Sequence, residues 1–82
     1  MKSLLEKTKE KLKEQNLTFA LTRENYEDYK GILTDDKTGF SMKNISIPKC
    51  LQFNKIGSWV IMIRELIDNQ QLIAKLQKEH KL

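Results

Sequence analysis

The stretch LTFALTRENYEDYKGILTDDKTGFSMKNISI, residues 17–47, decides the fold of this chain. Residues 17–22 and 40–47 alternate apolar and polar side chains, which is the period of a strand with one buried face. Residues 26–34 form a further strand, whose polarity favours an edge position or a solvent-exposed side. Asp35-Asp36-Lys37-Thr38-Gly39 is rich in turn formers and includes a glycine able to adopt a positive φ. Residues 17–47 are therefore predicted to form a three-stranded antiparallel meander.

Finer features of the meander also follow from the alternation. Leu17, Phe19 and Leu21 are expected to point inward, and a turn is expected over residues 23–25. In the third strand, the apolar positions change phase near Lys43-Asn44. Such a change indicates a β-bulge or a break in the strand.

Helices are predicted on both sides of the meander. Residues 3–15 have a helical pattern with Ser3 as the cap, inside a helical arm spanning 1–16, and their narrow apolar stripe leaves open whether this arm is docked or free. Residues 54–80 form a long helix whose apolar face for the sheet includes Leu66. A second apolar set lies behind that face and requires another partner, either the N-terminal helix or a second subunit: Ile61, Met62, Leu72, Ile73 and Leu76. The fold class is α+β, as one small domain over 1–82 with the long C-terminal helix packed on the sheet.

Length and composition exclude several classes of protein. The 82 residues suffice for one small domain with a thin core, and the single cysteine excludes an internal disulfide framework. The longest apolar run, residues 59–63, is far shorter than the ~20 residues of a membrane span, and no secretory signal is recognisable. We therefore expect a cytoplasmic protein without membrane contact. Usage rich in Lys, Asn and Ile is expected of an AT-rich genome, such as that of a low-GC bacterium or a phage.

The distribution of charge suggests a polyanionic partner. The net charge is +4, and residues 37–64 contain five cations and no acid. Lysine and exposed aromatic side chains together are typical of single-strand binding, because bases stack on rings while lysine neutralises phosphates. The candidate nucleic-acid-binding residues are Lys30, Lys37, Lys43, Lys49, Lys55, Tyr26 and Tyr29. The alternatives are that these cations point in unrelated directions, and that Phe40 and one tyrosine belong to the core.

The residues give little support to an enzyme. His80 is the only histidine, Cys50 has no histidine near it in sequence, and Asp35-Asp36 reads as a pair of turn residues. The glycines are isolated, so no phosphate-binding loop is present. We expect no catalytic residues, no metal site and no cofactor.

Two families resemble parts of this sequence. The order helix, three strands, helix resembles the double-stranded-RNA-binding domain, although the loop and helix-start motifs of that family are missing. Thr38-Gly39, Lys43, Ile45-Ser46-Ile47 and Trp59 resemble the positive-cofactor-four type of transcriptional coactivator, with Asn44 where that family has glycine. The second resemblance implies a single-stranded-DNA binder in which Lys30, Lys43 and Lys49 contact the backbone and the last helix forms a dimer.

Two functions therefore remain open at the level of sequence. The first is a small basic nucleic-acid-binding module of little sequence specificity, favouring single strands, associated with transcription or replication and homodimeric through residues 59–76. The second is a protein-interaction adaptor or inhibitor of the phage or mobile-element type, acting through the amphipathic C-terminal helix.

Overall fold

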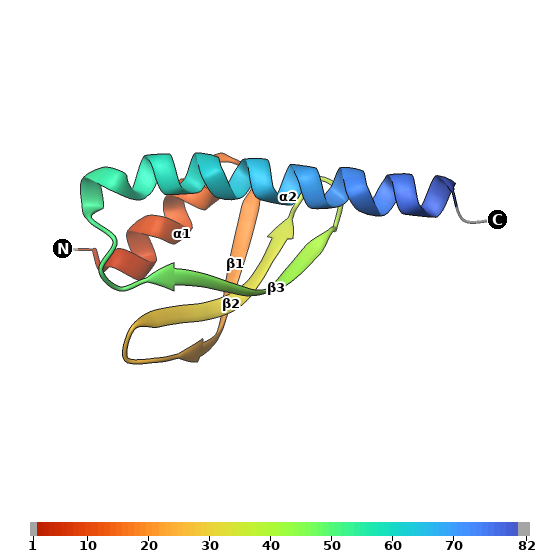
Figure 1. Ribbon diagram of the computed structural model, residues 1–82. Helices are drawn as coiled ribbons and strands as arrows, with labels where there is room; N and C mark the ends of the chain where they lie inside the picture. The colour runs from red at the N-terminus through yellow and green to blue at the C-terminus, as the bar shows by residue number, and fades with distance from the viewer. Residues whose placement is uncertain (1, 81–82) are drawn as a thin grey trace.

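A three-stranded sheet and two helices make up the structure. The computed structural model describes residues 2–80. The elements in chain order are α1 (Leu4–Glu14), β1 (Leu17–Glu24), β2 (Asp28–Asp35), β3 (Ser41–Pro48), a 3₁₀ turn (Phe53–Lys55) and α2 (Ile56–Glu79). The strands pair antiparallel in the order β1-β2-β3, and α2 lies across them beside α1 (Figure 1). The predicted α+β fold is confirmed.

The core lies between the sheet and α2, and α1 closes one side. Four residues of α2, spaced by four, three and four, form its buried ridge: Ile56, Val60, Ile63 and Ile67. Their partners come from the inward face of each strand and from α1: Leu17, Phe19, Leu33, Ile45, Ile47 and Leu12. The helical period of the one set and the alternation of the other explain why these residues meet.

The N-terminal helix is docked and is not a free arm. Leu12 and Thr8 are fully buried, the latter donating its hydroxyl to the carbonyl of Leu4 at 2.7 Å. The Ser3 hydroxyl accepts from the backbone N–H of Glu6 at 3.2 Å, which confirms the predicted cap. Asn16 adopts a φ of 59° and ends the helix, as asparagine does more readily than other non-glycine residues.

The first hairpin turns later than the sequence predicts. Strand β1 continues through Glu24, and Asn25 closes the turn against Asp28 with a backbone and a side-chain hydrogen bond of 2.8 Å each. The predicted turn over 23–25 and the predicted start of the second strand at Tyr26 are therefore each wrong by two residues. An asparagine side chain that bonds the residue three positions on stabilises a turn at that point.

The expected burial of Leu21 and the expected edge position of the second strand are also wrong. Leu21 is 41% exposed, because the β1–β2 hairpin leads away from both helices beyond Phe19 (Figure 1). Strand β2 is the central strand, so it is not at an edge. Its polar residues Asp28, Lys30 and Thr34 alternate with the buried residues 31, 33 and 35 and stand on the face of the sheet that no helix covers, which was the other expectation for this strand.

The second hairpin matches the prediction. Gly39 has a φ of 78° in the turn, and its N–H donates to the carbonyl of Asp35 at 2.7 Å. The pairing of β2 with β3 shifts between Gly31–Ile45 and Leu33–Met42, so Lys43 and Asn44 together oppose Ile32. Asn44 has a φ of 62° there. This is the predicted bulge, and it explains how Ile45 and Ile47 reach the core despite the change of phase.

Helix α2 extends well beyond the sheet. It begins at Ile56, after the 3₁₀ turn, where the sequence predicts a helix from residue 54, and it continues unbroken for 24 residues. After Gln71 every described residue of this helix is exposed. The molecule measures 51 × 23 × 17 Å, and its long axis results from the projecting end of α2 (Figure 1).

Candidate functional site

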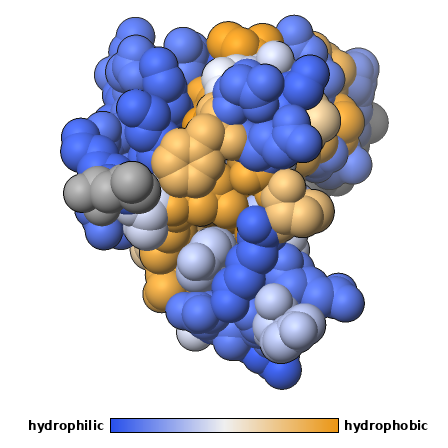
Figure 2. Space-filling view, turned by 90° about the vertical axis from the view of Figure 1, so that its left-hand side faces the viewer, coloured by the Kyte–Doolittle hydropathy of each residue, from blue (hydrophilic) through white to orange (hydrophobic). Residues whose placement is uncertain are grey.

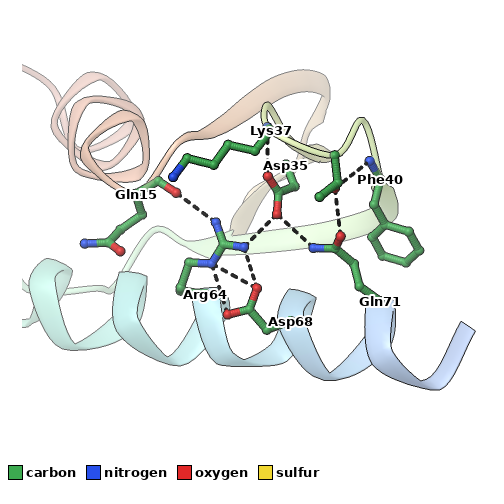
Figure 3. Close-up of polar contacts among 8 residues, drawn as sticks. Gln15, Asp35, Lys37, Phe40, Arg64, Asp68 and Gln71 are labelled. Atoms are coloured by element: carbon green, nitrogen blue, oxygen red, sulfur yellow. Dashed lines mark hydrogen bonds and ion pairs between the residues drawn. The ribbon is translucent and has the colours of Figure 1, made fainter. Parts of the chain in front are cut away.

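The most connected polar cluster joins α2 to the second hairpin and to the end of α1. The Arg64 guanidinium donates to the Asp35 carboxylate at 2.6 Å, to the carbonyl of Gln15 at 2.8 Å and to Asp68 (Figure 3). Gln71 donates to the same Asp35 carboxylate at 2.8 Å. Asp35 is only 2% exposed, so its charge depends on these donors.

These contacts perturb both charged groups. Burial raises the pKa of Asp35, but hydrogen bonds from Arg64, Gln71 and the backbone N–H of Lys37 outweigh it, and the pKa falls to about 2. The hydrogen bond to Asp68 raises the pKa of Arg64, against an opposing effect of burial and with further support from Asp35. Both groups therefore stay ionised through the physiological range of pH.

This cluster is structural. Within residues 2–80, every buried side-chain nitrogen or oxygen has a hydrogen-bond partner. The buried donors and acceptors of the cluster are therefore already satisfied within the protein. The sequence analysis treated Asp35 as a turn residue and Arg64 as part of the cation run. Two signals could have found the pair: Asp35 continues the inward alternation after Leu33, and Arg64 follows the buried Val60 by one helical turn.

Four of the predicted nucleic-acid-binding residues gather near the β1–β2 turn. Lys49 forms an ion pair of 2.8 Å with Glu24, and its ammonium lies 5.0 Å from the centre of the Tyr29 ring. Lys30 donates to the hydroxyl of Ser46 at 3.1 Å and lies 3.8 Å from Asp28. Tyr26, at the tip, is 97% exposed.

Charge at this end of the sheet is balanced. The hydrogen bond to Glu24 raises the pKa of Lys49, and the hydrogen bond from Asn25 lowers the pKa of Asp28. An open groove of about 610 Å³ lies here and is lined by Tyr26, Glu27, Asp28, Pro48, Lys49 and Cys50. Its two carboxylates and one paired ammonium give a phosphate little net attraction.

The other three lysines lie elsewhere. Lys37 is in the β2–β3 turn next to Thr38, whose hydroxyl donates to the side chain of Gln71 at 2.7 Å. Lys43 is in the bulge of β3, and Lys55 immediately precedes α2. Residues 55 and 71 are about 24 Å apart along the helix axis, at 1.5 Å per residue. The cations of the mid-chain run are thus distributed along the molecule, and one of them, Arg64, is held by two carboxylates.

Apolar surface is exposed in two places. The first is the end of the molecule where α2 begins, where Figure 2 shows apolar side chains between hydrophilic regions and Phe53 is 53% exposed. The second is α2 itself, where six large apolar side chains are 38–55% exposed: Ile61, Met62, Leu66, Leu72, Ile73 and Leu76.

The exposed residues of α2 do not share one face. At 100° per residue, Met62, Leu66, Ile73 and Leu76 lie within a stripe about 80° wide, and Leu72 borders it. We call these four residues the α2 stripe. Ile61 lies on the opposite side of the helix axis from Leu66, beside Lys11 and Glu14 of α1. The sequence analysis missed Leu66, which it assigned to the sheet-facing set.

The described residues offer no cluster of metal-binding groups. Among residues 2–80, no group of three or more His, Cys, Asp or Glu side chains is placed to hold a metal ion. Neither helix of this described range combines the length and the apolar character that crossing a bilayer requires. His80 and Cys50 are both exposed and far apart in sequence.

Comparison with known proteins adds no relative: no family model, curated protein or solved structure matches this chain. The two family resemblances therefore rest only on the residues quoted for them, and they remain predictions.

Proposed function

We propose that this protein is a protein-interaction module that works as a homodimer, with α2 packed along α2 of a second copy. The observation that carries the proposal is the α2 stripe, which begins over the sheet and continues onto the projecting end of the helix. Large apolar side chains gathered on one exposed face often mark an interaction site in water-soluble domains.

The projecting end of α2 gives a second reason to expect a partner. Residues 72–80 have no tertiary support, and so short a helix is marginal in water. Ile73 and Leu76 are 45% and 44% exposed on it. A helix that packs along the stripe would remove these side chains from water and would hold the projecting turns in place.

A second copy suits this surface because α2 is electrically neutral. Residues 56–79 contain three cations (Arg64, Lys75, Lys78) and three acids (Glu65, Asp68, Glu79). Two copies of the helix therefore approach without net repulsion, although each chain carries +4 overall.

The exposed area allows a modest affinity. Each side chain of the stripe still has about half of its surface to bury, which contributes ~1 kcal/mol. Eight such side chains contribute ~8 kcal/mol, and association costs at least ~4 kcal/mol. The difference of ~4 kcal/mol corresponds to a dissociation constant of about 1 mM.

Sedimentation equilibrium tests the proposal directly. We expect the fraction of dimer to rise between about 10 μM and 1 mM and to become substantial at the upper end. Ile73→Glu should be monomeric throughout that range, since it places a charge in the stripe. The matched control is Ala74→Glu, one residue away and directed toward the opposite flank, and it should dimerise like the parent. A parent protein that stays monomeric at ~1 mM would refute the proposal.

Nucleic-acid binding remains the second prediction, with less support from the site geometry. The lysines are dispersed, and those near the exposed tyrosine are paired with acids. Titration of fluorescent single-stranded and duplex oligonucleotides at two salt concentrations tests it, because phosphate contacts weaken steeply with salt. Salt-dependent binding that Lys37→Glu with Lys43→Glu abolishes would restore nucleic acid as the principal partner.

A further inference from the structure

Five exposed positions along α2 follow the spacing of a coiled coil. Starting at Met62, the intervals alternate four and three residues: Met62, Leu66, Asn69, Ile73 and Leu76. In heptad notation Leu66 and Ile73 are a positions, and Met62, Asn69 and Leu76 are d positions. The α2 stripe therefore has the spacing of a coiled-coil seam, interrupted once by a polar residue.

We infer that the two copies of α2 pair in parallel and in register, with Asn69 of one copy against Asn69 of the other. This inference rests on the proposed homodimer. It adds the orientation of the partner helix and assigns a specific role to one exposed polar side chain.

Asn69 distinguishes between the two orientations. In a parallel pair, d positions face d positions, so each Asn69 amide meets an identical amide that can both donate and accept. In an antiparallel pair, d positions face a positions, so Asn69 would face Leu66 or Ile73. A buried amide opposite an aliphatic side chain loses its hydrogen bonds to water without replacement.

The rest of the fold is compatible with this arrangement. The buried ridge of α2 and the seam are about 130° apart around the helix axis, so the sheet faces away from the partner helix. Glu65 occupies a g position and would face Gln70 of the partner at e. The carboxylate can accept from that amide, and no like charges oppose each other there.

Disulfide trapping tests the orientation. The native thiol is first removed by Cys50→Ser, which is conservative at an exposed position. In that background Leu76→Cys should form a disulfide-linked dimer under mild oxidation, because facing d positions lie about 6 Å apart at Cα. The control Ala74→Cys, which lies off the seam, should stay unlinked. A sample that is dimeric in sedimentation but leaves Leu76→Cys unlinked would overturn the parallel orientation and keep the homodimer, whereas a monomeric sample overturns both.

A second variant tests the role of Asn69. Replacing it with leucine removes the polar layer, so Asn69→Leu should tighten self-association at least tenfold and form mixed orientations or higher oligomers. The mixture would appear as partial loss of the Leu76→Cys disulfide and as a broadened mass distribution. If Asn69→Leu changes neither the affinity nor the trapping, Asn69 does not lie in the interface and the inference fails.

Discussion

The ion pair between Arg64 and Asp35 should dominate the stability of the connection between α2 and the second hairpin. Replacing Arg64 with methionine keeps the aliphatic stem but leaves the Asp35 carboxylate buried, with Gln71 and one backbone N–H as its remaining donors. Breaking a buried pair in this way costs about 3–5 kcal/mol. Arg64 is itself partly exposed, with 21% of its side chain in water, so we expect the lower end, about 3 kcal/mol.

The pH dependence of the free energy of unfolding provides an independent measure of the contact between Arg64 and Asp35. The pKa of Asp35 is lowered from 3.8 to about 2, so the contribution of its ionised form is complete above pH 4 and disappears as the pH falls through 2. A shift of this size corresponds to about 2 kcal/mol of stability at neutral pH. In the variant Asp35→Asn, the free energy of unfolding should change less between pH 4 and pH 2 than it does in the parent protein.

Urea unfolding followed by circular dichroism measures both effects. The matched control is Asp68→Ala, which removes only the exposed partner of Arg64 and should cost no more than about 0.5 kcal/mol. If Arg64→Met costs as little as this control, or if the parent loses no more stability than Asp35→Asn between pH 4 and 2, the reasoning about the buried pair is wrong.

Four smaller changes test the backbone geometry by the same unfolding assay. Gly31→Ala should cost about 1–3 kcal/mol, because its methyl would overlap the carbonyl of the neighbouring strand and lie 2.6 Å from the Phe19 ring. Gly57→Ala meets open space at the start of α2 and should instead gain about 0.5–1 kcal/mol; equal effects of the two alanines would contradict this packing. Asn44→Val should cost about 1–2 kcal/mol at a φ of 62°, and tolerance of valine would mean that the bulge is not held in this conformation. Ser3→Ala should cost about 1 kcal/mol, and no loss would show that the cap contributes nothing.

The sequence was sufficient to predict the architecture because hydrophobic periodicity is local. Alternation in residues 17–47 and the helical period from residue 56 specify which side chains meet, and the turn at Gly39 specifies where the chain reverses. The change of phase in the alternation also predicted the bulge at Asn44. The exposure of Leu21 was not predictable in this way, because alternation indicates the side of a sheet on which a residue lies but not how far a helix covers that side.

The candidate site was less predictable because it depends on distances between elements. In the sequence, five mid-chain cations form one group without an intervening acid. In the fold, Lys37 and Lys55 lie apart, and Arg64 forms an ion pair with Asp35. The way in which α2 crosses the sheet also determines which of its apolar residues remain exposed. Leu66 fits a sheet-facing set by helical angle alone, yet 38% of it is exposed.

The outer edge of β3 has a consequence for how this protein meets other chains. An unpaired strand edge can recruit a strand from another molecule and so begin aggregation. Here the bulge at Lys43 and Asn44 interrupts the regular spacing of hydrogen-bonding groups, and Pro48 at the end of the strand has no N–H to donate. Strand addition at this side of the sheet is thereby discouraged.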